Sequence, residues 1–231
     1  MSVYVTGDTH AYIDVSKLYT KNFKGSNRLT ENDFVIICGD FGFFWDGSET
    51  EKYFQKWFAE KPYITLFCDG NHENFNMLSE IPIVDFMGGK AGKVNDHLYY
   101  LLRGECYVIN GKKFFVMGGA TSADKNLRVE NESWWPQEIP SEEEFNHAVE
   151  TIKKNHYKFD YIISHCAPDS VVDKLSYGFY EHDKLTNFFE QKVKNECDFE
   201  QWHFGHYHLD KNYTVDGKEY HCHYNEIEKV I

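Results

Sequence analysis

Short hydrophobic runs recur along the chain, and a polar cluster follows several of them. In the first third they alternate with amphipathic segments, which predicts parallel strands joined by right-handed helical crossovers. The expected strands are Val3–Thr6, Asp33–Cys38 and Tyr63–Cys68, and the expected helices are Asp14–Asn22 and Ser48–Glu60. In the second of these helices, Tyr53, Trp57 and Phe58 should share the buried face, with Phe54 beside it.

From residue 81 the runs are separated by Gly, Asn and Asp, which predicts an antiparallel half of the sheet. Asn110-Gly111 has the composition of a tight hairpin turn. The expected strands are Ile81–Phe86, His97–Leu102, Glu105–Ile109 and Lys113–Met117. Residues 118–140, which follow, are irregular and resemble an insertion that sets specificity.

The remaining segments return to longer helical patterns. A capping box, Ser141 with Glu144, should start a helix that buries Phe145, Ala148, Val149 and Ile152. Asp183 should cap another that buries Leu185, Phe188, Phe189 and Val193. The last expected strands are Phe159–Ser164, Phe199–Phe204, Asn212–Val215 and Glu219–His223. Without a repeat, low-complexity tract or linker, residues 1–231 read as a single domain.

Composition narrows the class of protein. With 231 residues, 42% hydrophobic and 17% aromatic, the chain can build one substantial core. A net charge of −13 without clustered Lys or Arg disfavours tight non-specific binding to nucleic acid. The first residues enter a strand at once and no segment approaches 18 apolar residues, so we expect neither a leader nor a membrane span. Six scattered cysteines favour free thiols in a reducing compartment, and hence a cytoplasmic protein.

Five polar clusters carry the candidate chemistry, each directly after a hydrophobic run. They are Asp8-Thr9-His10, Gly39-Asp40, Asn71-His72, Ser164-His165 and His206-Tyr207-His208. Loops at strand ends are where open α/β sheets build their sites. Carboxylate, imidazole and amide donors without thiolate suit divalent Mn, Fe, Zn, Co or Ni. Taken alone, each residue is better explained as part of a capped turn or as a surface polar group, and only the complete set of residues points to a metal site.

The ordered set Asp-x-His, Gly-Asp, Gly-Asn-His-Glu, His and Gly-His-x-His resembles that of the calcineurin-like metallophosphoesterases. It spans Asp8 to His208, nearly the whole chain. The resemblance implies a four-layer α/β/β/α sandwich of two mixed sheets with flanking helices. It implies two divalent ions, with Mn or Fe favoured. The ligands would be Asp8, His10, Asp40 and His208 for one ion and Asp40, Asn71, His165 and His206 for the other, with Asp40 bridging.

The activity implied is hydrolysis of phosphoric esters, by phosphatase or phosphodiesterase chemistry. Two ions about 3.5–4 Å apart generate a bridging hydroxide that attacks phosphorus in line. His72 is the candidate catalytic residue, which would protonate the leaving oxygen or stabilise its charge. Two positions depart from the family pattern: Phe43 replaces an acid that often supports this histidine, and Ala11 replaces a glycine. Asp69 or Glu73 are the alternatives for that support.

Other residues have weaker assignments. Arg128, Arg103 and Trp134 are candidate substrate contacts. Salt bridges explain the arginines at least as well, and a core position explains Trp134 better. His221-Cys222-His223 could bind a metal, but alternation along a strand explains it better. We expect ordinary structural roles for the remaining histidines, which are His97, His147, His156, His182 and His203. A phosphorylated small molecule, nucleotide or phosphoprotein is the expected partner, and the oligomeric state is left open. A non-enzymatic scaffold or metal-binding regulatory module is the alternative function.

Overall fold

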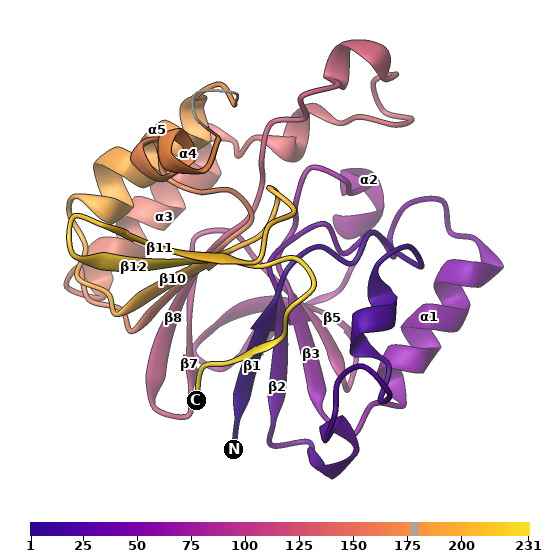
Figure 1. The fold of residues 1–231 in the computed structure, drawn as a ribbon. Helices are drawn as coiled ribbons and strands as arrows, with labels where there is room; N and C mark the ends of the chain where they lie inside the picture. The colour runs from indigo at the N-terminus through magenta and orange to yellow at the C-terminus, as the bar shows by residue number, and fades with distance from the viewer. Residues whose placement is uncertain (177–179) are drawn as a thin grey trace.

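Two β-sheets pack face to face, with helices on their outer faces (Figure 1). The computed structural model describes residues 1–176 and 180–231. Both sheets mix parallel and antiparallel strands, which confirms the predicted four-layer α/β/β/α sandwich. Among the described residues, no helix has the length and apolar character needed to cross a bilayer.

The first sheet contains seven strands. Its central strands run parallel because helical or irregular crossovers connect them, whereas both edges are antiparallel. Its order is β13 (Glu228–Lys229), β1 (Val3–Thr6), β2 (Phe34–Ile37), β3 (Ile64–Phe67), β6 (Leu98–Leu101), β5 (Gly89–Asn95) and β4 (Ile83–Phe86).

The second sheet contains six strands, with four parallel strands between two antiparallel hairpin partners. Its order is β11 (Lys211–Val215), β12 (Lys218–Cys222), β10 (Gln201–Phe204), β9 (Tyr161–Ser164), β8 (Lys112–Met117) and β7 (Glu105–Ile109). The expected hairpin turn at residues 110–111 is therefore confirmed, and a second hairpin turns at residues 216–217.

Helices cover the two outer faces separately. Helix α1 (Glu49–Ala59) packs on the first sheet, and α2 (Phe75–Leu78) follows the loop that comes after β3. Helices α3 (Glu142–Lys154), α4 (Asp169–Ser176) and α5 (Lys184–Phe188), with the π-helical continuation η5 (Phe189–Lys194), cover the second sheet. Short 3-10 turns η1 (Val15–Leu18), η2 (Ser26–Arg28), η3 (Lys125–Leu127) and η4 (Pro136–Glu138) lie in the connections.

The central strands are buried on both faces, which explains their continuous hydrophobic runs. In β2, Phe34 and Ile36 point into the layer between the sheets, while Val35 and Ile37 point toward α1. In α3, the capping box at Ser141 is present and Phe145, Ala148 and Ile152 are buried, as predicted. This packing leaves the carboxyl ends of the strands free to carry polar loops.

Two predicted helices differ from expectation. In place of the helix expected over Asp14–Asn22, the chain forms only the 3-10 turn η1. Its hydrogen bonds join residues three apart, and Val15 and Leu18, which are also three apart, are both buried. In α1 the buried face carries Glu51, Phe54 and Phe58, whereas Tyr53 is 63% exposed. The rotation follows from Glu51, because its carboxylate accepts the backbone N–H groups of residues 45–47.

The middle of the chain is divided between the sheets. Only β4, β5 and β6 form an antiparallel edge of the first sheet, whereas the β7–β8 hairpin belongs to the second sheet. Strand β6 pairs with β3 in parallel, and β8 pairs with β9 in parallel. The expectation that this half of the chain would be wholly antiparallel was therefore wrong. Strand β5, rich in Gly and Lys, gave no hydrophobic signal. Helices α2 and α4 and strand β13 were also not anticipated.

Candidate metal centre

The five polar clusters follow β1, β2, β3, β9 and β10, and the structure brings all of them together. The first sheet supplies four of the seven donors and the second sheet supplies three. From the first sheet come Asp8, His10, Asp40 and Asn71; from the second come His165, His206 and His208. The site therefore lies across the junction of the two sheets.

Asp40 lies at the centre of these contacts and is 1% exposed. Its Oδ2 lies 3.2 Å from His10 Nε2, and its Oδ1 lies 3.2 Å from His165 Nε2. Oδ1 also accepts the backbone N–H of His72 at 2.8 Å. One carboxylate thus faces imidazoles from both sheets, which is the position that a bridging ligand requires.

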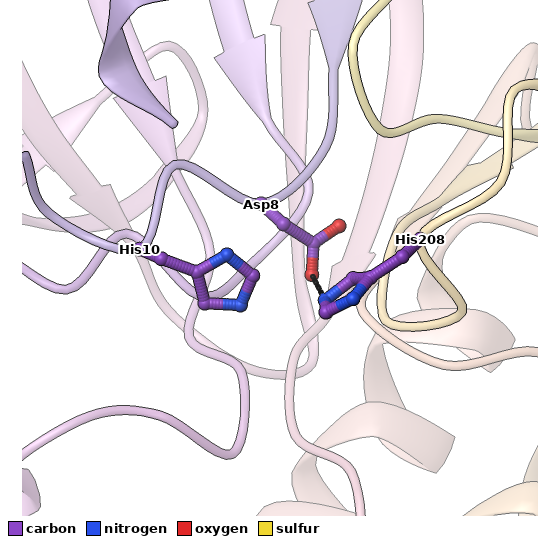
Figure 2. A group of neighbouring side chains, drawn as sticks. All are labelled: Asp8, His10 and His208. Carbon is purple, nitrogen blue, oxygen red and sulfur yellow. Dashed lines mark ion pairs between the residues drawn. The ribbon is translucent and has the colours of Figure 1, made fainter. Parts of the chain in front are cut away.

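Asp8 forms a second focus, between two imidazoles (Figure 2). Its Oδ1 lies 3.8 Å from His208 Nε2, and its carboxylate accepts the backbone N–H of His206 at 3.1 Å. Ligand atoms of Asp8, His10 and His208 lie within 4.8 Å of one another. Those of Asp8, Asp40 and His165 form a second such group, so the two groups share Asp8.

The amide of Asn71 and the imidazole of His206 complete the second group. Asn71 Oδ1 lies 3.2 Å from His165 Nε2, and the His165 and His206 ring centroids are 5.0 Å apart. His10, Asp40 and His72 also offer atoms within 4.8 Å of one another, so His72 reaches the same space. Two carboxylates, one amide oxygen and four imidazoles fit the donor set of two divalent ions of the Mn, Fe or Zn class.

Unusual backbone conformations concentrate in these loops. His10, Asp40, His206 and His208 have positive φ angles of 41°, 49°, 66° and 52°. Left-handed non-glycine residues are strained and persist where the surroundings hold them, which is common at functional sites. The neighbouring glycine is required as well, because a Cβ on Gly39 would overlap the His165 ring.

Burial of the carboxylates sets the electrostatics. Burial raises the pKa of Asp8 to about 7, helped by the nearby charge of Asp40. Burial alone would also raise the pKa of Asp40, but His165 and His10 hold it well below its usual range. Burial lowers the pKa of both histidines, yet Asp40 outweighs it and raises each to about 9. The buried acids thus require compensating positive charge, which protons or divalent ions supply.

Two supports orient the imidazoles, and sequence reasoning missed both. His10 donates its Nδ1–H to Asp14 at 2.7 Å, and His165 donates its Nδ1–H to the carbonyl of Cys38 at 2.7 Å. Each bond fixes the tautomer and leaves Nε2 facing Asp40. Asp14, four residues after His10, could have been recognised from its spacing. The Cys38 carbonyl carries no sequence signal.

Residues from the 118–140 segment orient the Asn71 amide. Asn71 Nδ2 donates to Ser122 Oγ at 3.1 Å, and Ser122 Oγ donates to Glu138 Oε2 at 2.6 Å. Because the Nδ2 group is held on this side, Oδ1 faces His165. Neither Ser122 nor Glu138 was anticipated, since an irregular segment gives no pattern from which to infer the contact.

His72 is contacted by Arg128 from the same segment. Asp69 and Glu73, the expected supports, are engaged elsewhere: Asp69 pairs with Arg103, and Glu73 accepts the backbone N–H groups of residues 41 and 42. At the position of the missing acid, Phe43 is fully buried among Phe41, Phe54 and Phe58.

Two candidate substrate contacts occupy different surroundings. Arg103 is 5% exposed, and its guanidinium binds Asp69, Glu144 and the carbonyl of Gln137. We therefore assign it a structural role. Trp134 is half-buried, and its neighbour Trp135 packs in the core against Trp45.

A hollow of about 690 Å³ adjoins the site. His10, His72 and His208 line one part of it, and Tyr12, Trp45 and Tyr224 line others. The hollow is thus lined by imidazoles and by aromatic side chains, and its volume is in the range of small-molecule binding sites.

Solved structures that resemble this chain include two bacterial proteins. One is the phosphopantetheinyl hydrolase of Mycobacterium tuberculosis, at 14% identity and a TM-score of 0.47, covering 97% of this chain and 90% of that one. The other is a putative 5'-nucleotidase of Staphylococcus aureus in complex with alpha-ketoglutarate, at 15% identity and a TM-score of 0.48; the match covers 99% of this chain and only 50% of that one. Among curated proteins, no sequence matches. The sequence model described as calcineurin-like phosphoesterase matches residues 1–220, and the chain therefore belongs to that family.

Proposed function

We propose that this phosphoester hydrolase acts on a small phosphorylated molecule, with two divalent ions bound between its sheets. The observation that carries the proposal is the convergence of seven donor side chains beside a hollow of about 690 Å³. Because donors come from both sheets, we regard residues 1–231 as one catalytic unit. Six buried free thiols support a reducing compartment, and we place the protein in the cytoplasm.

The proposed ligands divide into two sets that share Asp40. Asp8, His10, Asp40 and His208 would hold one ion, and Asp40, Asn71, His165 and His206 the other. Such a pair of ions lowers the pKa of water and neutralises phosphoryl charge, which suits a protein of net charge −13. The supports from Asp14, the Cys38 carbonyl and Ser122 fix the ligand side chains in advance.

His72 is proposed to act on the leaving oxygen. Its backbone N–H is tied to Asp40, while its ring lines the hollow. Burial lowers the pKa of His72, and the charge of Arg128 adds to that effect. A neutral imidazole there can donate an N–H hydrogen bond to the leaving oxygen and stabilise its developing charge.

Arg128 supports the reading of residues 118–140 as a specificity insertion. Its guanidinium, beside His72, offers donors to a phosphoryl oxygen. Tyr12, Trp45 and Tyr224 in the hollow favour a leaving group with a ring or an apolar part. We therefore favour a nucleotide or a comparable small ester over a phosphoprotein.

Hydrolysis of p-nitrophenyl phosphate and bis-p-nitrophenyl phosphate tests this function. The protein would be stripped with chelator and reloaded with Mn²⁺ or Fe²⁺, with His72→Ala as the control. A preference for the monoester directs the search to mononucleotides, and a preference for the diester to cyclic nucleotides. If neither ester is cleaved above the variant with any reloaded metal, a metal-binding scaffold becomes the better description.

A further inference from the structure

A second group of histidines lies outside the site described above. His203 on β10 is in register with His221 on β12, and His223 follows two residues later. Side chains alternate along a strand, so these three imidazoles share the inner face of the second sheet. Their neighbours Trp202 and Cys222 pack in the helix-covered core on the other face. Glu228 reaches the group from β13, the edge strand of the first sheet.

The four side chains approach one another closely. His221 Nδ1 lies 3.0 Å from Glu228 Oε2, and His203 Nδ1 lies 2.9 Å from His223 Nε2. His223 Nε2 is 3.8 Å from the same Glu228 oxygen. Ligand atoms of His203, His221 and Glu228 all lie within 4.8 Å of one another. In a tetrahedral zinc site with bonds of about 2.0–2.1 Å, ligand atoms are about 3.3 Å apart, so small adjustments suffice.

These imidazoles are buried where apolar side chains are expected. His203, His221 and His223 are 0%, 5% and 3% exposed. Nε2 of His221 is buried without a hydrogen-bond partner in the described part of the chain. Burying polar groups is unfavourable unless they are satisfied, so three imidazoles in the layer between the sheets require an explanation.

The outward nitrogens of two rings face oxygen acceptors. His203 Nε2 lies 3.3 Å from Gln201 Oε1, and His221 Nε2 lies 3.6 Å from Glu219 Oε2. Without a cation, His221 Nδ1–H donates to Glu228. With a cation bound, protons on these outward nitrogens would leave each Nδ1 lone pair free to bind it, which is how metal-bound histidines are oriented.

We propose that His203, His221, His223 and Glu228 bind one divalent cation of the zinc class, separate from the two ions of the phosphoesterase site. Imidazole nitrogens with one carboxylate oxygen suit Zn²⁺, Co²⁺ or Ni²⁺. The ion takes the place of the proton that His203 and His223 would otherwise share. His223 and Glu228 line a surface hollow together with Asp210, Glu226 and Lys211. Its carboxylates outnumber its single ammonium group, which favours cation entry.

The bound ion would connect the two sheets, because Glu228 belongs to β13 of the first sheet and the histidines belong to or follow strands of the second sheet. Strand β13 has only two residues, and it pairs with β1 while Glu228 points to the second sheet. A ligand that binds only the folded state stabilises it by mass action. The site is therefore a structural one, and the inference does not rest on the proposed catalytic function.

The test compares zinc content and thermal stability between the wild-type chain of 231 residues and two variants, His221→Gln and Glu228→Gln. Each protein is stripped with chelator, dialysed against Zn²⁺ and counted by atomic emission. We expect each variant to hold one zinc ion fewer per chain than the wild type. Added Zn²⁺ should raise the midpoint of thermal unfolding by about 3 °C more in the wild type than in either variant. Tetrahedral Co²⁺ absorption should diminish in parallel.

His147→Gln is the matched control, because His147 also pairs with a glutamate, Glu105 at 3.0 Å, but is exposed. It should keep the wild-type zinc count. Equal counts and equal thermal shifts in the wild type and both variants would overturn the proposal and leave only a hydrogen-bonded histidine network. Loss of one ion in a protein inactive on every ester would reject the proposed function and retain this site.

Discussion

The guanidinium of Arg128 spans the imidazole of His72, with Nη1 3.2 Å from Nδ1 and Nη2 3.3 Å from Nε2. A neutral imidazole has a single acceptor nitrogen, so only one of these contacts is a hydrogen bond. Asp124 and the carbonyl of Ser133 hold the guanidinium in this position. The irregular segment thus brings a fixed positive charge to the histidine that faces the hollow.

Replacing Arg128 with alanine should lower kcat/KM about 10-fold or more, because hydrogen bonds to charged groups contribute about 1.5–3 kcal/mol. Metal content should stay unchanged, because the described contacts of the Arg128 side chain are with His72, Asp124 and Ser133, and none of these is a proposed metal ligand. Arg128→Lys keeps the charge but cannot span the ring, and should recover only part of the loss. Steady-state kinetics with both nitrophenyl esters checks this, and wild-type kinetics in Arg128→Ala would exclude a substrate role.

Replacing His72 with alanine should cut turnover at least ~100-fold, the low end for general acid–base catalysis. The metal count should remain that of the wild type, because the proposed ligands are all retained. Single-turnover kinetics and atomic emission on the same preparation provide the two readouts. Loss of an ion together with the side chain would instead make His72 a ligand, as its position near His10 and Asp40 permits.

Replacing Ser122 with alanine should weaken metal binding about 10–100-fold, since outer partners orient the ligands that they contact. The Asn71 amide would lose the bond that holds Nδ2 away from His165. Competition with a fluorescent chelator measures the affinity. Ser79→Ala is the control, because Ser79 is exposed and its hydroxyl donates to the carbonyl of Asn76, away from the proposed ligands. Equal affinities in the two variants would contradict the orienting role.

Replacing Gly39 with alanine should abolish metal binding or folding, because the added Cβ would overlap His165. Gly217 offers a matched control, since its φ of 79° is close to the 85° of Gly39 while a Cβ there meets open space. Gly217→Ala should therefore show only the backbone strain, about 1 kcal/mol. Chemical denaturation measures the free energy of unfolding of both variants. Similar losses of stability in the two would show that the His165 side chain moves aside to accommodate the new Cβ, which would contradict the prediction.

Glu190 should make stability depend on pH. Burial would raise its pKa, but hydrogen bonds from Lys194 and Ser170 outweigh this and lower it. Because the folded-state pKa is depressed, the stabilisation is full above the unfolded value of about 4.5 and is lost as pH falls through the folded one. Glu190→Gln should cost about 2 kcal/mol at pH 7. Urea denaturation with chelator present should show the difference shrinking below pH 4.5, and a constant difference would exclude this origin.

Elements defined by local patterns were predictable from the sequence. The strand cores of β1, β2 and β3, the capping box at Ser141 and the cap at Asp183 depend on residues close together in the chain, and all are present. Short-range chemistry was sufficient for these elements. The meeting of Asp40 and His165 was implied by the resemblance to the calcineurin-like metallophosphoesterases, and the structure brings the two side chains together.

Features decided by tertiary contacts were not predictable. Strand β5 forms because β4 and β6 flank it, although its own residues have little strand preference. Glu51 turns inward because a loop presents three N–H groups to it, which rotates α1. Ser122 reaches the site through irregular backbone whose path has no periodic signal. Arg128 was a candidate substrate contact from the sequence, but its position beside His72 had no such signal either. His203, to which the sequence assigned an ordinary structural role, lies near Glu228 only because the two sheets pack against each other, and such packing leaves no local pattern.

The contact between Asp8 and the backbone N–H of His206 joins positions 198 residues apart. A nascent chain therefore lacks the complete donor set until nearly all of it has been synthesised, and the set forms only when both sheets have docked. Occupancy of the centre by two ions would accordingly report on completed folding. Chains cleaved or misassembled before that stage would keep many of the individual ligands and yet remain without a phosphoesterase site.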